Sequence, residues 1–289
     1  MRKNLLALVT AALVVLGLQA PAHASTQGNA DGEAHPNVGL ILSYSDDGFR
    51  YRCTATLIRD DLLLTAAHCT DGVVGKVLVT FDSTIVAGRT RPDVSPFPAA
   101  ANPKVGYLGT EGSAPKYYFG DAHTHPGYSG FTDMKNWNDV GVVVLDQPIP
   151  ADVITPASVA GVGTLDGIKK SDLSKTRFTA VGYGTEVRKA DAGPQKPTAM
   201  DYPLIRRSVD MYGQKLTPQI LQTNGSTTNG KDTGSTCFGD SGGPVFLDGK
   251  VVAVTSYGLN EVCRGVSGYQ RVDIASAQDW LADDFGYQF

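Results

Sequence analysis

The chain is a succession of short apolar segments interrupted by turn-forming residues, and this pattern limits its possible folds most strongly. The segments are of strand length and mostly rich in β-branched residues. They are Leu40–Leu42, Ala55–Ile58, Leu62–Thr65, Val77–Phe81, Val140–Leu145, Phe178–Val181, Pro244–Leu247 and Val251–Thr255. Nothing before the C-terminal end has sustained helical periodicity. The sequence therefore predicts an all-β sandwich or a pair of barrels and argues against alternating βαβ units.

One helix is expected at the C-terminal end. Residues Ile274 to Phe285 place apolar side chains at helical spacing, with Asp273 as the candidate N-cap. Two stretches rich in proline and glycine, residues 83–135 and 185–203, are expected to be long surface loops.

The first 24 residues have the pattern of a secretory signal peptide. A basic start is followed by an uncharged apolar run from Leu5 to Leu18 and by an A-x-A cleavage site at 22–24. The run is shorter than the roughly 20 apolar residues of a membrane span, which an uncleaved anchor would need. We therefore expect a signal peptide at 1–24, a secreted mature chain at 25–289 and no membrane attachment after cleavage.

The charge balance bears on the class of partner. The chain has 25 Lys+Arg against 29 Asp+Glu, and two of the basic residues lie in the signal peptide. No basic patch or polybasic tail stands out, so nucleic acid and anionic membrane surfaces are not expected as partners.

The mature chain contains all four cysteines, Cys53, Cys69, Cys237 and Cys263. An even number in an exported protein favours disulfides, and four cysteines allow three pairings. Zinc binding is the competing use, but no C-x-x-C or H-x-x-x-H spacing supports it. Neither a metal site nor a cofactor is predicted. So few disulfides in an exported chain of this length favour a bacterial origin.

The stretch TCFGDSGGPV at 236–245 contains the G-x-S-x-G pattern of a serine nucleophile, centred on Ser241. The alternative to a catalytic serine is a tight turn of small residues that has only a structural role. In α/β-hydrolases the histidine follows the serine along the chain. Here no histidine follows His125, so that order is impossible.

The remaining order places a histidine and an aspartate ahead of Ser241. The candidate histidines are His35, His68, His123 and His125. His68 lies in LLLTAAHC, directly after an apolar strand and beside Cys69, where a disulfide could hold it rigidly. His123 and His125 are interpreted as ordinary loop residues.

At this point the chain resembles the chymotrypsin/trypsin family. T-A-A-H-C at 65–69 and G-D-S-G-G-P at 239–244 match the family's histidine and serine motifs letter for letter. N-D-V-G-V-V-V-L from Asn138 is similar to its aspartate motif. The segments H-P-G-Y at 125–128, G-Y-G at 182–184 and S-Y-G at 256–258 extend the resemblance over nearly the whole mature chain.

The resemblance implies two six-stranded antiparallel β-barrels and a C-terminal helix that buries Trp280. It implies a catalytic triad of His68, Asp139 and Ser241 in the cleft between the barrels. Other aspartates compete with Asp139 by residue type alone, namely Asp133, Asp146 and Asp240. The implied oxyanion hole consists of the backbone N–H groups of Gly239 and Ser241.

The same resemblance implies two disulfides, Cys53–Cys69 and Cys237–Cys263. It also implies a specificity pocket with Ser235 at its floor. Further substrate-binding positions are Ser256, Gly258 and Ser267, of which Gly258 leaves the wall open and Ser267 narrows the pocket. Because the floor residue is neutral, we expect uncharged side chains before the cleaved bond. Glu261 could restore a basic preference, but a solvated loop charge is its simpler interpretation.

Activation departs from the family pattern. Family members commonly insert a new N-terminus, often Ile-Val-Gly-Gly, beside the aspartate that precedes the nucleophile, which is Asp240 here. The region STQGNADGEAHPNVGL contains no such motif, and the expected N-terminus falls near Ser25. We hypothesise that signal cleavage itself produces the amine; the alternative is another partner for Asp240.

The sequence thus predicts a monomeric, secreted serine endopeptidase acting on protein or peptide substrates. A noncatalytic binding protein built on a protease fold is the alternative. A triad used mainly on esters is a weaker one.

Overall fold

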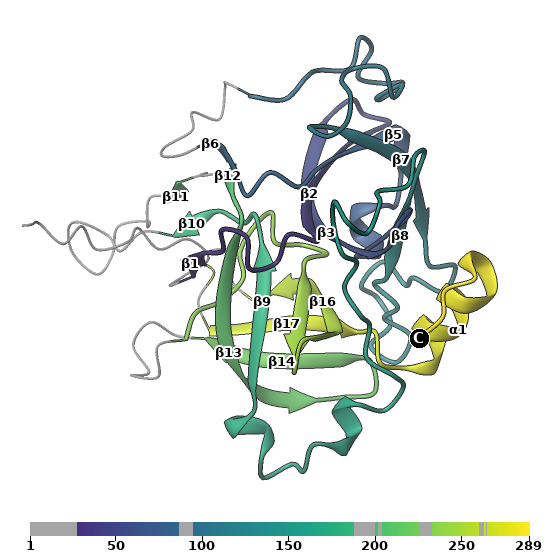
Figure 1. Ribbon diagram of the computed structural model, residues 1–289. Helices are drawn as coiled ribbons and strands as arrows, with labels where there is room; N and C mark the ends of the chain where they lie inside the picture. Colours follow the sequence, from purple (N-terminus) through teal and green to yellow (C-terminus); the bar gives the residue numbers. More distant parts are fainter. Residues whose placement is uncertain are drawn as a thin grey trace, which may run out of the picture.

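The computed structural model describes residues 28–86, 95–187, 200–201, 204–225, 233–259, 263 and 265–289. Two β-barrels lie next to each other in Figure 1, the first built from the N-terminal half of the chain and the second from the C-terminal half. This arrangement confirms the predicted fold, with two closed six-stranded antiparallel barrels and a C-terminal helix.

The first barrel closes in the spatial order β2-β3-β4-β8-β7-β5. Its strands are β2 Val38–Ser45, β3 Arg50–Arg59, β4 Leu62–Thr65, β5 Val73–Thr80, β7 Tyr118–Thr124 and β8 Gly141–Leu145. A short 3-10 helix, η1 (Ala67–Cys69), directly follows β4. The order brings β4 and β8 together, so the segment after β4 lies beside the segment before β8.

The second barrel closes because β13 pairs with both β14 and β9. Its strands are β9 Arg177–Gly182, β13 Arg207–Leu216, β14 Ile220–Gly225, β15 Pro244–Leu247, β16 Lys250–Gly258 and β17 Gly265–Arg271. Strand β1 (Asn29–Ala30) adds to the edge of β13. The remaining elements are the pairs β6 Thr84–Val86 with β12 Leu204–Ile205 and β10 Glu186–Val187 with β11 Met200–Asp201, and the 3-10 helices η2 Leu165–Gly167 and η3 Leu173–Lys175.

Every apolar segment predicted as a strand lies in or largely within one, and the segments at 62–65 and 244–247 match β4 and β15 end to end. The barrel strands are antiparallel, so side chains alternate between a barrel interior and its outer face. In β13, buried and half-buried side chains alternate over most of the strand.

A hydrophobic core joins the two barrels and the C-terminal helix α1 (Ala275–Phe285). Side chains from all three parts contact one another in it: Val38, Leu62, Leu64 and Val142 from the first barrel, Val181, Phe246 and Val254 from the second, and Ala277, Trp280 and Leu281 from α1. Because burial of such side chains is the main stabilising contribution, this shared core holds the two barrels and α1 together.

The helix was predicted within one residue of its start, but the predicted N-cap is wrong. Ile274 occupies the N-cap position, and no side chain there caps the helix. The carboxylate of Asp273 instead accepts the N–H of Leu165 at 2.6 Å and bonds the guanidinium of Arg271. At the other end Gly286 adopts φ +63°, the left-handed conformation that commonly ends helices.

The prediction of a plain surface loop over 83–135 is also wrong. Strand β7 of the first barrel lies within it, and His123, interpreted as a loop residue, belongs to that strand. Ahead of β7, the side chains of Phe97, Tyr107 and Tyr117 are buried against Leu40, Leu42 and Tyr44 on the first barrel. The segment therefore covers the barrel with its own apolar cluster.

Several sequence-based predictions lie outside the described residues. They are the signal peptide at 1–24, the N-terminus near Ser25, Glu261 and most of the predicted loop at 185–203, of which strands β10 and β11 are described. Among the described residues, no helix is long and apolar enough to cross a membrane.

Candidate active site

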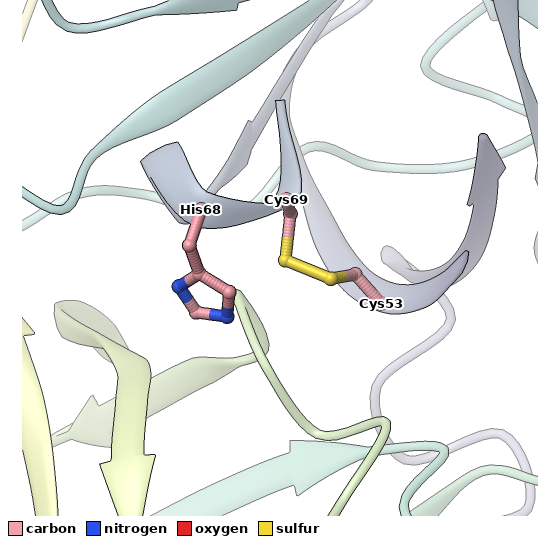
Figure 2. A group of neighbouring side chains, drawn as sticks. All are labelled: Cys53, His68 and Cys69. Carbon is pink, nitrogen blue, oxygen red and sulfur yellow. A yellow bond between two sulfur atoms is a disulfide. The ribbon is translucent and has the colours of Figure 1, made fainter. Parts of the chain in front are cut away.

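His68 lies in η1, at the point where the chain leaves β4. Ala66 and Ala67 ahead of it are fully buried, and Cys69 after it is bonded to Cys53 of β3. Figure 2 shows the imidazole and the disulfide on the same turn, with Cys53 reaching in from the neighbouring strand. The disulfide therefore fixes the histidine-bearing turn to the wall of the first barrel.

Cys53, His68 and Cys69 bring two sulfur atoms and a ring nitrogen within 4.8 Å of one another. The two sulfur atoms are bonded to each other, whereas zinc needs deprotonated thiolates as ligands. This cluster is therefore structural in the oxidised protein. The second disulfide, Cys237–Cys263, is also present, so the structure contains both pairings that the family resemblance implied.

Asp139 precedes β8 and has a fully buried side chain. The N–H of His68 donates to its Oδ1 at 2.9 Å, and Nδ1 of His68 lies 2.8 Å from its Oδ2. The hydroxyl of Ser256 donates to Oδ2 at 2.6 Å. A buried carboxylate without such donors would be strongly destabilising, so these contacts are what allow a charge to remain there.

The residue before Asp139 explains how the carboxylate is aimed. Asn138 has φ +43°, a left-handed conformation that asparagine tolerates better than most residues. Its side chain donates to the carbonyl of Gly127 at 3.0 Å and accepts from the hydroxyl of Ser276 at 3.1 Å. The turn into β8 is thus fixed on both sides.

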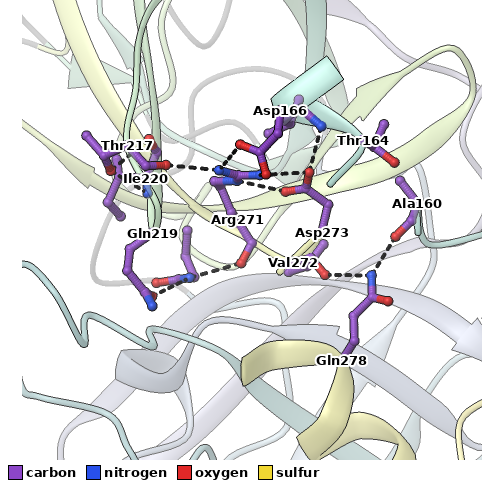
Figure 3. A network of polar contacts seen from close by, with 12 residues as sticks. Ala160, Thr164, Asp166, Thr217, Gln219, Ile220, Arg271, Val272, Asp273 and Gln278 are labelled. Atoms are coloured by element: carbon purple, nitrogen blue, oxygen red, sulfur yellow. Dashed lines mark hydrogen bonds and ion pairs between the residues drawn. The ribbon is translucent and has the colours of Figure 1, made fainter. Parts of the chain in front are cut away.

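A polar network in the second barrel holds the backbone of Asp139. Its backbone N–H donates to the side chain of Gln270 at 3.1 Å, and that amide donates to Gln219 and to the carbonyl of Arg271. Figure 3 shows the continuation, in which the buried guanidinium of Arg271 bonds Asp166, Asp273 and the carbonyl of Thr217.

Burial alone would lower the pKa of Arg271, but the bonds to Asp273 and Asp166 raise it instead. Arg271 therefore stays charged and anchors the base of the site.

Ser241 lies in a loop that packs against the histidine-bearing turn. Its carbonyl accepts the N–H of Thr54 at 2.8 Å, and a side chain added at Gly242 would collide with Thr65. Gly242 has φ +76°, so both its conformation and the close contact require glycine. Ser241 and His68 thus lie on adjoining segments, although no direct hydrogen bond joins them among the described contacts.

The backbone of this loop leaves two donors available. The N–H groups of Asp240, Gly242 and Gly243 all donate to carbonyls at 2.8 to 3.0 Å. Among the described contacts, those of Gly239 and Ser241 donate to no protein group. Gly239 has φ +98°, a conformation that only glycine adopts easily. The two available N–H groups are the pair predicted for an oxyanion hole.

Asp240 is buried. Its carboxylate accepts the N–H of Gly184 at 2.7 Å and that of Cys237 at 2.8 Å. A side chain at Gly184 would collide with this carboxylate, which explains the glycine of the G-Y-G segment. The N-terminal amine predicted as the partner of Asp240 lies outside the described residues.

A cavity of about 350 Å³ opens beside Ser241. The predicted substrate-binding residues Ser235, Ser256, Gly258 and Ser267 all line it. The hydroxyls of Ser235 and Ser267 lie 2.8 Å apart and are almost completely buried, so one donates to the other and the pair carries no charge. The side chain of Ser256, however, is bonded to Asp139 rather than turned to the cavity.

The competing titratable residues lie elsewhere. The carboxylate of Asp146 pairs with Lys76 at the surface, and Asp133 accepts hydrogen bonds within its own turn. His35 bonds Asp31, and burial lowers the pKa of His125, whose ring packs on Trp280.

Sequence reasoning missed three residues beside the site, namely Phe131, Trp137 and Gln270. The Phe131 ring lies 5.5 Å from that of His68, and the side chain is 42% exposed. Phe131 falls in the stretch 83–135 interpreted as a loop, and Trp137 lies between that stretch and the predicted strand at 140–145. Gln270 is polar within a strand of few apolar residues, so no local signal distinguished it.

The sequence was compared with known proteins. It matches the trypsin family over residues 29–281. It is 26% identical over 250 residues to a trypsin from Saccharopolyspora erythraea, covering 85% of this chain and 92% of that protein. It is 28% identical over 242 residues to a trypsin-like protease from Streptomyces glaucescens, covering 79% and 75%.

Among solved structures, that of HL collagenase is similar, with a TM-score of 0.60, 20% sequence identity and coverage of 92% of this chain and 100% of that one. At this identity the structural likeness supports the fold alone, whereas the sequence match extends over most of the chain. On these grounds the chain belongs to the trypsin family of serine proteases.

Proposed function

We propose that the protein is a secreted serine endopeptidase that hydrolyses peptide bonds through an acyl-enzyme intermediate. The observation that carries the proposal is the hydrogen-bonded pair of His68 and the fully buried Asp139, next to the loop of Ser241. A serine hydroxyl is a weak nucleophile until a base removes its proton. With Nδ1 of His68 bonded to the carboxylate, Nε2 is left for that task.

Each group then has a defined part in the reaction. Ser241 Oγ attacks the peptide carbonyl carbon while His68 takes its proton, and His68 then gives this proton to the leaving amine. Water repeats the sequence on the acyl-enzyme. The N–H groups of Gly239 and Ser241 stabilise the tetrahedral oxyanion; loss of one such donor typically raises the barrier by about 3 to 4 kcal/mol.

The cavity favours an uncharged side chain before the cleaved bond. Its floor is the neutral pair Ser235 and Ser267, which offers no counter-charge to lysine or arginine. At its lining, Phe238 is 55% exposed and Leu259 is 64% exposed, so the surroundings of the cavity are apolar. We therefore expect substrates with an apolar residue before the cleaved bond.

Activation by signal cleavage is part of the proposal. An amine at Ser25 would add a cationic partner to the buried carboxylate of Asp240. We expect one extra residue ahead of Ser25 to lower the activity by about 10-fold or more. The extra residue would displace the amine and leave the buried carboxylate of Asp240 without its cationic partner. Unchanged activity of the extended protein would refute this part alone.

The noncatalytic alternative is not favoured. His68, Asp139 and Ser241 are all present, and the loop donors predicted to bind an oxyanion are available. A binding protein would have no need of a buried charge beside a histidine. Secretion and a monomeric state stay predictions.

The test is covalent labelling of the mature chain, residues 25–289, with a fluorophosphonate, followed by peptide mapping. We expect a single adduct on Ser241, absent in Ser241→Ala and strongly slowed in His68→Ala. Ser158→Ala, which removes an exposed hydroxyl far from the cleft residues, is the matched control and should label like the parent. A folded, disulfide-bonded protein without an adduct on Ser241 would refute the proposal.

A further inference from the structure

Trp137 is a buried indole beside the triad with no part in the reaction described so far. Its side chain is 7% exposed, and it lies two residues before Asp139. Its ring centroid is 5.2 Å from that of Phe131 and 5.5 Å from that of Tyr257. These contacts hold the indole in one orientation between the loop before β8 and strand β16.

The polar edge of this indole points at Ser256. Nε1 of Trp137 donates to Ser256 Oγ at 3.0 Å, and Ser256 Oγ donates to Asp139 Oδ2 at 2.6 Å. An indole N–H can only donate, so it must occupy a lone pair of the hydroxyl. The single hydroxyl hydrogen of Ser256 is then directed to the carboxylate. The direction of both bonds is fixed by the identity of residue 137.

Such a chain has an electrostatic effect on the carboxylate. Asp139 has a fully buried side chain, where hydrogen bonds are stronger than in water and successive bonds polarise one another. A hydroxyl that accepts from an indole N–H is a better donor than one that does not. The charge on Asp139 is therefore shared more evenly between Ser256 and His68.

We propose that Trp137 is a positioning residue that acts on Asp139 through Ser256, and so sets how strongly the triad carboxylate holds the protonated form of His68. The inference rests on the proposed function, because its main readout is turnover. It adds to the triad and Ser256 a fifth side chain, which does not touch the reacting atoms.

Loss of the indole donor has a definite sign. With the Ser256 hydroxyl less polarised and free to rotate, the carboxylate keeps more charge for the imidazolium. The protonated, inactive form of His68 then persists to higher pH. The acid limb of the kcat/KM profile should move to higher pH, and kcat should fall because the hydrogen-bond geometry is less fixed.

Other titratable groups near the pair stay in place in every variant. Among the described residues, Tyr257 packs on Trp137, and Tyr128 lies near enough to Asp139 that burial, followed by the charges of Asp139 and Asp71, raises the pKa of Tyr128. A difference in the acid limb between variants therefore reports the hydrogen bond from Trp137 to Ser256.

The experiment compares the parent with Trp137→Phe, which keeps an aromatic ring and removes the N–H. The substrate is a chromogenic amide with a single residue before the cut, so that binding along the cleft contributes little. One hydrogen bond of this kind is expected to change kcat by about 3- to 10-fold, with KM nearly unchanged and the acid limb shifted upward.

Trp280→Phe is the matched control, because it is the same substitution at the other buried tryptophan, on α1. It should leave the acid limb in place. Ser256→Ala removes the middle of the chain, so adding Trp137→Phe to it should change the profile no further. If Trp137→Phe folds poorly, 3-benzothienylalanine at position 137 replaces the N–H by sulfur with the ring shape kept.

A parent that hydrolyses the amide while Trp137→Phe has the same kcat and acid limb would overturn the inference and leave the proposed function intact. An equal effect of Trp137→Phe with and without Ser256 would also overturn it. A parent that neither hydrolyses the amide nor labels at Ser241 would instead refute the proposed function.

Discussion

Two buried polar clusters lie beside the cavity next to Ser241, the first reaching it through Ser256, and they differ in charge. Asp139 has a fully buried carboxylate surrounded by the N–H of His68, the imidazole and the hydroxyl of Ser256. Ser235 and Ser267, almost equally buried, form a neutral hydrogen-bonded pair that lines the cavity. A buried carboxylate needs several hydrogen-bond donors to offset its lost hydration, whereas a neutral pair of hydroxyls has no charge to offset. Substitutions in the Asp139 cluster should therefore cause large losses of activity, whereas substitutions in the Ser235–Ser267 pair should change the substrate preference.

The largest effect is expected for Asp139→Asn. An amide can present its NH2 donor to Nδ1 of His68, where a carboxylate can only accept, so the imidazole takes the wrong tautomer. We expect kcat to fall by about 10⁴-fold with the fold preserved, as measured by steady-state kinetics and thermal unfolding. Asp133→Asn, in the same loop, is the control and should keep full activity. A loss of less than about 10-fold in Asp139→Asn would break the comparison.

Arg271→Ala tests whether a buried charge that loses its partner is also costly away from Ser241, here in the free energy of unfolding. Its removal leaves the fully buried Asp273 without its guanidinium. Breaking a buried pair on one side typically costs about 3 to 5 kcal/mol of unfolding free energy. Urea unfolding measures it, with Lys175→Ala at an exposed pair as the control, where about 0 to 1 kcal/mol is expected. Equal losses in the two variants would contradict the account.

Ser235→Asp tests the neutral cluster. A carboxylate at the cavity floor has Ser267 as a donor but lacks a counter-charge until a basic side chain enters. We expect the ratio of kcat/KM for lysine over leucine before the cut to rise by about 10- to 100-fold. Ser235→Asn, similar in size and uncharged, should leave the ratio nearly unchanged. If the asparagine variant shifts the ratio as much, size rather than charge determines the preference.

The smallest effect is expected for Asp166→Asn, at the exposed end of the Arg271 network. The hydrogen bond from Arg271 lowers the pKa of Asp166, so its contribution to stability is present above its ordinary value of 3.8 and is lost as the pH falls through the folded value. Because the side chain is 63% exposed, the loss at neutral pH should be below about 1 kcal/mol. Urea midpoints of parent and variant should converge toward pH 3; a gap that widens there would contradict this sign.

The sequence was sufficient to predict those parts of the candidate site that depend on a few consecutive residues. Short motifs identified His68 and Ser241 because tight turns with fixed backbone conformations need particular residues, such as the glycine at 242. Apolar runs located the most buried strands. Strands β13, β14 and β17 were missed because polar residues and glycine alternate with few apolar ones along them.

What could not be predicted depends on contacts between distant segments. Asp273 was interpreted as a helix cap because its position suited one, but a carboxylate two residues from Arg271 is better paired with that guanidinium. Trp137 and Ser256 are 119 residues apart, so no local pattern joins them. The apolar cluster of Phe97 and Tyr107 was hidden in a stretch rich in proline and glycine.

The most direct test of the contrast between the proposed triad and the neutral pocket is cleavage profiling of a mixed peptide library by the protein of residues 25–289, with Ser241→Ala as control. The account predicts cleavage that disappears in the control and follows uncharged, mainly apolar residues. Cleavage after lysine or arginine would contradict the neutral pocket, and no cleavage by the folded protein would contradict the proposed activity itself.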